Sequence, residues 1–298
     1  MRIVVVAGFG MLGHKLVQIL GRDKEVIATV REGAARWPKA LPAAEVVAGV
    51  DIRDSRTMAA VLERYAPEAV LNAAGVIKHV VGAHDPVDTV AINGTAPNIL
   101  AHLCEARGIR LLQYSTDCVF TGAQTSMRGP NGYREEDVPD AADLYGMTKY
   151  LGEPRRHALV LRTSIIGREL KGHLGLVDWF LSQGEGPVNG YKRALFTGLP
   201  TAELARVTGM ILDDHPGLDG LWHVATDPID KYSLLGLLKD AFGRATIIQP
   251  AEAFYCDRRL DGSRFAARTG WKSAPWPELV AAMAQDSFDY DSYSEKPE

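Results

Sequence analysis

A glycine-rich turn near the amino terminus is the feature that most constrains the fold. Residues 2–7 form a nearly continuous apolar run, which is typical of a strand buried on both faces. The turn follows directly, and a helical pattern of apolar residues continues through Leu16 and Leu20. A strand, a glycine turn and a helix in this order predict a dinucleotide-binding unit, with the pyrophosphate at the helix N-terminus. The residues predicted to contact the cofactor here are Gly8, Phe9, Gly10, Met11, Leu12 and Gly13.

Arg31 bears on which dinucleotide binds. A strand is predicted at Glu25 to Val30, and an NAD-specific site would carry Asp or Glu about 20 residues after the glycine turn. The sequence there is Ala28-Thr-Val-Arg-Glu32, and the guanidinium of Arg31 can hold a ribose 2′-phosphate with two hydrogen bonds. NADPH is therefore the expected cofactor, and Glu32 keeps NADH as an alternative.

Strands and helices alternate through the first 165 residues. Further strands are predicted at 45–50, 69–72, 110–115 and 158–162, and helices at 55–65 and 87–107, the second interrupted by Pro97. This alternation predicts an α/β fold with a doubly wound parallel sheet, as in Rossmann domains. Residues that follow two of the strands are predicted to lie against the cofactor: Asp51, Ile52, Asn72, Ala73, Ala74 and Gly75.

A smaller lobe is expected after Ile166, where the alternation weakens. Helices are predicted at 174–183, 202–212, 232–242 and 277–286, and short strands at 220–225 and 245–249. We divide the chain into a cofactor domain at 1–165, a sugar-nucleotide lobe at 166–287 with interleaved segments, and a frayed tail at 288–298. The long polar loop 121–140 is interpreted as a lid over the cleft between the lobes.

Tyr145 and Lys149 form the candidate catalytic pair. They stand four residues apart in a helical pattern, so both side chains leave one face of the helix. A nearby ammonium favours phenolate, and we expect the pKa of Tyr145 to fall from about 10 toward the working pH. Such a tyrosine can exchange a proton with a carbinol oxygen. An ordinary exposed pair is the alternative, and it loses weight because Ser115-Thr-Asp117 ends a neighbouring strand.

Charge and cysteine content exclude several other classes of protein. The net charge of −4 comes without a basic block, which argues against nucleic acid as a partner. No apolar run reaches the length of a membrane span, and the first residues do not resemble a signal peptide. The three cysteines, Cys104, Cys118 and Cys256, are too scattered to indicate a disulfide framework or a metal site. A cytoplasmic location is expected.

Several motifs together resemble one known family. Asn72-Ala-Ala-Gly75, Asn93 and Tyr145-x-x-x-Lys149 are similar to those of extended short-chain dehydrogenases/reductases. Ser115-Thr-Asp-Cys-Val-Phe-Thr-Gly122 resembles, more finely, the dTDP-4-dehydrorhamnose reductase group, as do Leu161-Arg-Thr-Ser164 and Gly198-Leu-Pro-Thr201. The resemblance covers nearly the whole chain and is looser beyond Ile166.

Two positions depart from the patterns of this superfamily. The first glycine of the extended glycine motif is replaced by Ala7, and we expect Gly8 to supply the flexibility one residue later. Cys118 stands where the related dehydratases carry Glu. Dehydration needs that additional acid/base group, so its absence favours a plain reductase.

The resemblance implies reduction of the 4-keto group of a nucleotide-linked 6-deoxyhexose, in deoxysugar and polysaccharide biosynthesis. By resemblance, Tyr145 protonates the alkoxide, Lys149 lowers the pKa of Tyr145 and binds the nicotinamide ribose, Thr116 holds the keto oxygen, and Asn93 orders the helix or a relay water. Ser115 is expected beside the cofactor. The candidate substrate-binding residues are Lys78, Asp117, Val119, Phe120, Arg162, Lys192, Arg258 and Arg259, with a solvated surface charge as the alternative for each cation.

Two other functions remain open at this point. An epimerase or epimerase–reductase can use the same scaffold, and some relatives are regulatory subunits that bind NADP without turnover. The intact set of Thr116, Tyr145 and Lys149 argues against a subunit without catalysis. The nucleotide can be dTDP, UDP or GDP, and a homodimer is expected by analogy with related folds.

Overall fold

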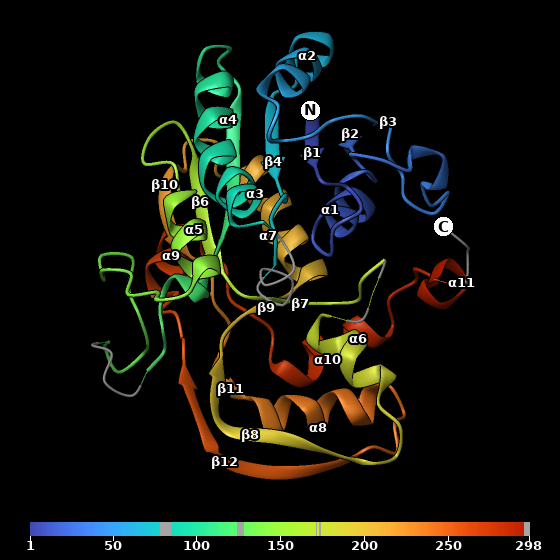
Figure 1. Ribbon diagram of the computed structural model, residues 1–298, viewed down its shortest axis with the longest axis vertical. Coiled ribbons are helices and arrows are strands. Elements are labelled where there is room, and N and C mark those ends of the chain that lie inside the picture. Colours follow the sequence, from blue (N-terminus) through green and yellow to red (C-terminus); the bar gives the residue numbers. More distant parts are fainter. Residues whose placement is uncertain (78–84, 124–127, 171, 173, 295–298) are drawn as a thin grey trace.

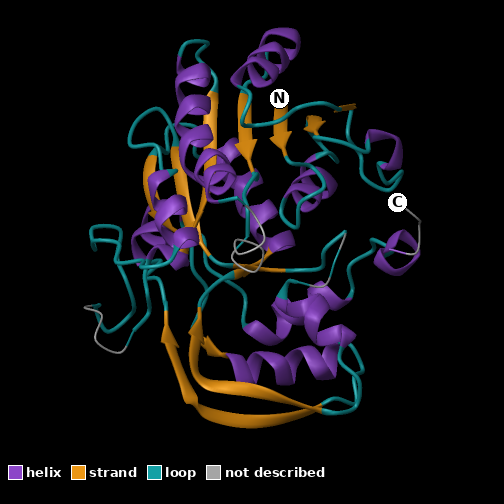
Figure 2. Ribbon diagram, in the orientation of Figure 1, coloured by secondary structure: helices purple, strands orange, loops and turns teal. Residues whose placement is uncertain are grey.

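A seven-stranded sheet forms the centre of the larger lobe (Figures 1 and 2). The structure is a computed structural model that describes residues 1–298 except 78–84, 124–127, 171, 173 and 295–298. The strands lie in the order β10-β6-β5-β4-β1-β2-β3, and each neighbouring pair is parallel. Their bounds are β1 (Arg2–Val6), β2 (Glu25–Thr29), β3 (Glu45–Val47), β4 (Ala69–Asn72), β5 (Arg110–Thr116), β6 (Leu159–Thr163) and β10 (Gly220–His223). The predicted doubly wound α/β fold is confirmed.

Strand β1 shows why the sheet is covered by helices on both faces. Its side chains alternate, with Ile3 and Val5 in one apolar cluster and Val4 and Val6 in another. Helices α1 (Gly13–Leu20) and α7 (Thr201–Asp214) cover the first cluster, and α2 (Ser55–Tyr65) and α4 (Ala96–Glu105) cover the second. Full burial of each such side chain stabilises the fold by roughly 1.5–3 kcal/mol.

The chain order of the strands reverses between β1 and β4, which are neighbours in the sheet. In open parallel sheets a crevice forms outside the carboxyl ends of the strands at such a reversal. The glycine turn follows β1 and the small residues 73–75 follow β4, so both open onto this crevice. The fold therefore places the two predicted cofactor segments side by side.

The predicted helix at 87–107 is regular at both ends and irregular in the middle. It consists of α3 (Pro86–Val90), a π-helical turn at Ala91–Thr95 and α4, with Pro97 in the first turn of α4. Proline is tolerated there because the first N–H groups of a helix have no partner within the helix. The π turn contains Asn93 and changes the direction in which its side chain leaves the helix.

The smaller lobe is a second sheet with helices packed on it (Figure 1). Its three strands lie in the order β11-β8-β12, and an apolar core that includes Phe180, Phe196, Leu234 and Trp276 joins it to the helices. The bounds are α6 (Leu176–Ser182), β8 (Pro187–Phe196), β11 (Ile229–Asp230), α8 (Lys231–Ala241), β12 (Ile247–Asp257) and α10 (Trp276–Ala284). No helix in the described ranges is long and apolar enough to cross a membrane.

Part of the chain beyond Ile166 returns to the larger lobe. Strand β10 pairs with β6, α7 packs on α1, and α9 (Ser263–Thr269) contacts β10. A two-stranded sheet of β7 (Ile165–Ile166) and β9 (Leu199–Pro200) lies where the chain passes between the lobes. The cleft is therefore crossed by several segments that fix one lobe against the other.

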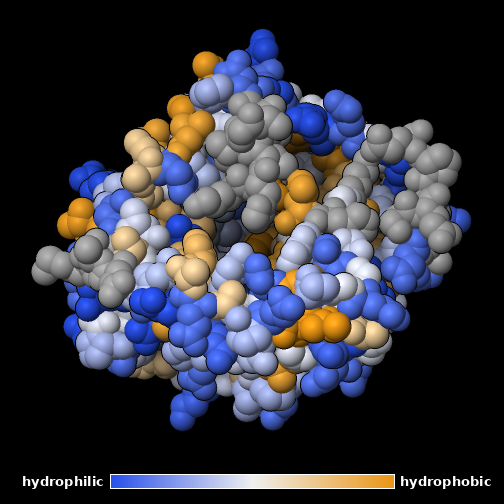
Figure 3. All heavy atoms as spheres, turned by 60° about the horizontal axis from the view of Figure 1, so that its bottom comes forward, coloured by the Kyte–Doolittle hydropathy of each residue, from blue (hydrophilic) through white to orange (hydrophobic). Residues whose placement is uncertain are grey.

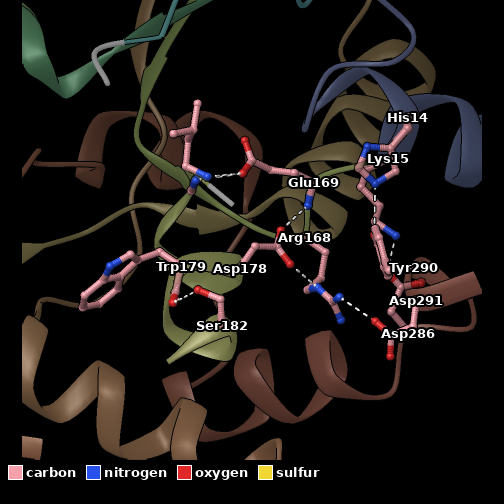
Figure 4. A network of polar contacts seen from close by, with 12 residues as sticks. His14, Lys15, Arg168, Glu169, Asp178, Trp179, Ser182, Asp286, Tyr290 and Asp291 are labelled. Atoms are coloured by element: carbon pink, nitrogen blue, oxygen red, sulfur yellow. Dashed lines mark hydrogen bonds and ion pairs between the residues drawn. The ribbon is translucent and has the colours of Figure 1, made fainter. Parts of the chain in front are cut away.

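The carboxyl-terminal segment corrects the prediction of a frayed tail from Phe288. Phe288 and Tyr290 are each 6% exposed, and α11 (Tyr290–Ser294) follows. The hydroxyl of Tyr290 donates to Asp286 and contacts His14 Nε2 at 3.0 Å, while Lys15 pairs with Asp286 (Figure 4). Two aromatic side chains and this polar network hold the segment on α1, so its polar composition was misleading.

The predicted lid is also anchored. Tyr133 is 2% exposed and stacks on Phe120 with ring centroids 3.9 Å apart. Its backbone N–H donates to the carbonyl of Arg259, and its carbonyl accepts from Asp261 N. The described part of loop 121–140 is thus attached to the core at Tyr133 and does not form a free lid.

Candidate active site

A cavity of about 1050 Å³ lies between the carboxyl edge of the large sheet and the smaller lobe. Its walls include the glycine turn, the ends of β4, β5 and β6, helix α5 (Leu144–Leu151) and parts of β8, α8 and β12. The face of the molecule shown in Figure 3 is hollowed, with hydrophobic residues at the rim of the hollow. The cavity thus connects the predicted cofactor turn with the predicted catalytic pair.

The glycine turn approaches the cavity through its backbone. Phe9, Gly10, Met11 and Leu12 line the cavity, and a Cβ on Gly13 would stand 2.1 Å from the carbonyl oxygen of Ala7. No other residue fits at Gly13, because a backbone atom cannot move aside. Helix α1 has no acidic residue in its first turn, which leaves its positive end available for an anion.

Ala7 corrects the expectation about Gly8. Ala7 has φ of 62°, a left-handed conformation that costs an L-residue roughly 1–2 kcal/mol. Gly8 lies under the ring of Trp37, where a Cβ would stand 2.9 Å from the ring. Gly8 is therefore needed for close packing, and the conformational strain falls on the alanine.

The charges of the residues after β2 suit the 2′-phosphate on the adenosine ribose of NADP. Arg31 follows β2, has a side chain 62% exposed, and among the described residues has only Glu32 as an ion-pair partner, at 4.0 Å. Asp51 is held by the guanidinium of Arg53, and Ile52 packs against the core on the far side of the sheet. Arg31 is thus available to an incoming phosphate, whereas Asp51 already has a cation of its own. Together with the glycine turn, these residues fit a bound NADP.

The end of β4 is held by side-chain amides. Asn72 donates to Gln113 at 2.6 Å and accepts from Ala74 N at 3.2 Å, which fixes the turn that lines the cavity. Asn93 accepts from Val76 N at 2.8 Å and donates to the Val76 carbonyl at 3.0 Å. The Asn93 amide is 1% exposed and engaged on both sides. These bonds order the segment after β4 against the π turn, and the expected role of Asn93, which is to order the helix or a relay water, stays a prediction.

Helix α5 brings the catalytic pair to the cavity. Asp143 caps it by accepting from Gly146 N at 2.8 Å. A Cβ on Gly146 would lie 2.2 Å from the carbonyl oxygen of Cys118, so this glycine allows the helix to approach the end of β5. Tyr145, Lys149 and Thr116 all line the cavity, and the Thr116 hydroxyl is near enough to Tyr145 to affect its titration. The Lys149 ammonium donates to the Tyr114 carbonyl at 2.8 Å.

The pKa of Tyr145 departs from the prediction. Burial raises the pKa of Tyr145 above its ordinary value, and the nearby Cys118 thiol adds to this, while the hydrogen bond with Thr116 opposes it. Burial also lowers the pKa of Lys149 to about 8, and the negative charge of Glu153 limits that fall. The expected lowering of the tyrosine pKa by lysine is wrong for the chain by itself, because desolvation is the larger effect.

Arg162 belongs to a buried ion pair, so the prediction that it binds the substrate is wrong. Its guanidinium is 2% exposed and donates twice to Glu153, at 2.7 Å each. Ser115 donates to the same carboxylate at 2.5 Å and also lines the cavity. The pair joins β6 to the end of α5. It therefore supports the helix that carries Tyr145, and it has no surface left for a sugar nucleotide.

The other predicted substrate residues divide into two groups. Asp117 and Arg258 line the cavity. The remaining described candidates do not line the cavity. Val119 and Phe120 are buried in a separate apolar core. Arg259 donates a hydrogen bond to Asp257, and Lys192 forms an ion pair with Glu252 at 4.0 Å. These four are corrected, because their side chains are buried in that core or paired outside the cavity. Lys78 lies outside the described residues.

Several residues of the cavity were not predicted from the sequence. Tyr191 and Phe254 form an aromatic pair with ring centroids 5.1 Å apart on the wall from the smaller lobe. Lys231 and Cys256 also line this wall. Tyr191 belongs to β8, a strand that was not predicted. A lysine at the start of a helix was the one signal available for Lys231, since cations are disfavoured there.

Comparison with known proteins shows what the chain is similar to. The model of a family described as the RmlD substrate binding domain matches residues 1–229. Agl14 of Haloferax volcanii, a probable low-salt glycan biosynthesis reductase, is 28% identical over 264 residues, 82% of this chain and 85% of that protein. The dTDP-4-dehydrorhamnose reductase of Streptomyces griseus is 30% identical over 152 residues, 51% of this chain and 43% of that protein. This chain thus matches less than half of the Streptomyces relative.

A solved structure shares the fold. The dTDP-4-dehydrorhamnose reductase of Bacillus anthracis, determined in complex with NADP, superposes with a TM-score of 0.75. It is 17% identical, and the superposition covers 95% of this chain and 98% of that one. At this identity the likeness establishes the common architecture of both lobes.

Proposed function

The chain belongs to the RmlD substrate-binding-domain family, and on this basis we propose that it reduces the 4-keto group of a nucleotide-linked 6-deoxyhexose with NADPH. The observation that carries the proposal is one continuous cavity with the glycine turn at one end and the hydroxyls of Thr116 and Tyr145 on its wall. Both named relatives are reductases, and one acts on dTDP-4-dehydrorhamnose. The product belongs to deoxysugar biosynthesis.

The chain's own residues supply the proton and the orientation. NADPH supplies the hydride when bound. Thr116 and Tyr145 hold the keto oxygen, and Tyr145 gives its hydroxyl proton to that oxygen as negative charge develops. Lys149 is fixed by the Tyr114 carbonyl and points a positive charge into the same end of the cavity. Its charge favours the phenolate that remains after the transfer.

Arg31 supports NADPH over NADH. Its exposed guanidinium follows β2, where an NAD site would use a carboxylate for the ribose hydroxyl. The nearby Asp51 is occupied by Arg53, with hydrogen bonds from both Nε and Nη2. Phosphate is therefore better matched than hydroxyl at this end of the site.

The wall from the smaller lobe suits the nucleotide part of the substrate. The aromatic pair of Tyr191 and Phe254 offers faces on which a base can stack. Arg258 supplies a cation for the diphosphate. A homodimer and a cytoplasmic location stay predictions, and light scattering of the purified protein tests the first.

The test is NADPH oxidation, followed by absorbance, against dTDP-, UDP- and GDP-linked 4-keto-6-deoxy sugars, with Tyr145→Phe beside the wild type. Loss of the transferable proton is expected to lower turnover by about 10²–10⁴-fold while NADPH still binds. Tyr150→Phe is the matched control, because Tyr150 lies on the same helix but is 36% exposed. Near-normal turnover by Tyr145→Phe would show that the acid is wrongly assigned. NADPH binding without oxidation of any sugar would instead favour a regulatory subunit.

A further inference from the structure

Two buried polar side chains directly follow the glycine turn. His14 and Lys15 are the second and third residues of α1, are 0% and 2% exposed, and do not line the cavity. Their partners lie near the other end of the chain, in residues 286–294, which we call the terminal segment (Figure 4). Burying a polar or charged side chain costs free energy unless it is bonded. The start of α1 therefore depends on the terminal segment.

The ring of His14 holds one peptide group of the glycine turn. The Gly10 carbonyl accepts from His14 Nδ1 at 2.8 Å and from the His14 backbone N–H at 3.1 Å. A carbonyl can only accept, so Nδ1 carries a hydrogen. Burial, together with the charge of Lys15, lowers the pKa of His14 to about 3. The ring is therefore neutral near pH 7, and its Nε2 is left as an acceptor.

Tyr290 provides a hydrogen for that acceptor. Its hydroxyl lies 3.0 Å from His14 Nε2 and 3.1 Å from Asp286 Oδ2, so its single hydrogen is shared between two acceptors. The Asp286 carboxylate is in turn paired with Lys15 of α1. A chain of hydrogen bonds thus runs from the Gly10 carbonyl through the imidazole to the terminal segment.

The peptide group at the end of this chain of hydrogen bonds faces the cavity. A peptide is planar and trans, so the Gly10 C=O and the Met11 N–H point in opposite directions. The carbonyl points into α1, where it accepts from His14, and the Met11 N–H therefore points out of the amino-terminal end of the helix. Gly10 and Met11 both line the cavity. Rotation of this peptide would move an N–H group that suits a pyrophosphate.

Arg168 attaches the same tyrosine to the smaller lobe. Its guanidinium lies 4.7 Å from the centroid of the Tyr290 ring and pairs with Asp291 at 3.1 Å. It also pairs with Asp178 of α6 (Figure 4). The terminal segment is thus held between α1 and α6, and both contacts fix the position of the Tyr290 hydroxyl.

We propose that the terminal segment sets the affinity of the protein for its dinucleotide, with Tyr290 acting through His14 on the peptide between Gly10 and Met11. Tyr290 and His14 are positioning residues, since neither lines the cavity. The inference rests on the cofactor in the proposed function and does not depend on the sugar. If docking of the segment favours the bound cofactor, the bound cofactor favours docking of the segment to the same extent.

Fluorescence titration of the wild type and its variants with NADPH and NADH tests the proposal. Tyr290→Phe removes one hydroxyl and is expected to weaken both dinucleotides by the same factor, roughly three- to tenfold, because both carry the pyrophosphate. In a His14→Leu background the same substitution should change the affinity little, because the contact through which it acts is absent. Tyr65→Phe is the matched control, since Tyr65 is buried in the apolar cluster on the other face of the sheet. It should bind both dinucleotides like the wild type.

Hydrogen exchange provides a second measurement on the wild type itself. Addition of NADPH is expected to slow amide exchange in residues 286–294, although these residues lie outside the cavity wall. Tyr290→Phe should reduce this protection. A residue that only stabilises the fold would lower the thermal midpoint and leave the affinity and the protection unchanged.

The outcomes separate this inference from the reductase proposal. Unchanged affinity in Tyr290→Phe overturns it, and so does weaker binding of NADPH alone, which would place the effect at the 2′-phosphate. A full effect in the His14→Leu background shows that Tyr290 acts by another route and also overturns it. If Tyr290→Phe does not fold, absence of protection by NADPH in the wild type decides against the inference. NADPH binding without reduction of any sugar leaves the inference intact and overturns the reductase alone.

Discussion

The buried pair of Arg162 and Glu153 makes a strong prediction for stability. The Glu153 side chain is 7% exposed, and Arg162→Met removes its guanidinium partner and leaves Ser115 as its hydrogen-bond donor among the described residues. An ionised carboxylate in that position has lost both water and its counter-ion. Removing one partner of a buried pair typically costs about 3–5 kcal/mol, mostly from the charge left behind.

This magnitude is large enough to measure in the whole protein. Domains of a few hundred residues lose about 2–4 °C of thermal midpoint per kcal/mol, so we expect a loss of roughly 6–20 °C. Replacing both residues with methionine removes the stranded charge as well as the pair. The double variant should therefore be more stable than Arg162→Met alone.

Urea unfolding followed by tryptophan fluorescence measures the free energy of unfolding of each variant. The control is Arg206→Met, which breaks an ion pair with Glu203 on α7 whose arginine is 55% exposed, and should cost less than about 1 kcal/mol. The reasoning is refuted if Arg162→Met costs no more than this control. It is also refuted if the double variant is the least stable of the series.

Two further predictions concern the cofactor turn. Ala7→Gly should raise the free energy of unfolding by about 0.5–1 kcal/mol, because glycine adopts φ of 62° without the steric penalty of alanine, and urea unfolding would show the opposite sign if this strain were absent. Arg31→Ala should weaken NADPH binding at least about tenfold while NADH binding changes little, as measured by fluorescence titration. Equal losses for both cofactors would remove Arg31 from the 2′-phosphate site.

The large sheet was predictable because its strands are buried on both faces. Short continuous apolar runs such as 2–7 and 69–72 are typical of strands that are buried on both faces of a parallel sheet. The start of α2 was predictable for a local reason, since Asp54 accepts from Arg56 N as a helix cap. Signals of this kind lie within a few residues of the element that they specify.

The sheet of the smaller lobe lacked such a signal. In strand β8, Gly190, Ala194 and Phe196 are buried on one face, but Lys192 interrupts that face in the sequence and is exposed, so the apolar alternation of a strand is broken. The strand exists because β12 and β11 pair with it, and β12 lies some 60 residues later in the chain. Pairing over that distance leaves little trace in the local sequence. The residues that β8 brings to the cavity, Tyr191 among them, were missed for the same reason.

The four-residue spacing of Tyr145 and Lys149 does not determine the pKa of the tyrosine. Tyr145 and Lys149 lie on one helix face as predicted, but the Lys149 ammonium is directed to the Tyr114 carbonyl, and burial controls both titrations. A raised pKa keeps Tyr145 protonated at neutral pH, which is the form that a reductase needs when it protonates an alkoxide. Desolvation therefore prepares the acid, and the lysine acts later, when its charge stabilises the phenolate. The sequence identified the pair, while the order of these two effects depends on the depth of the cavity.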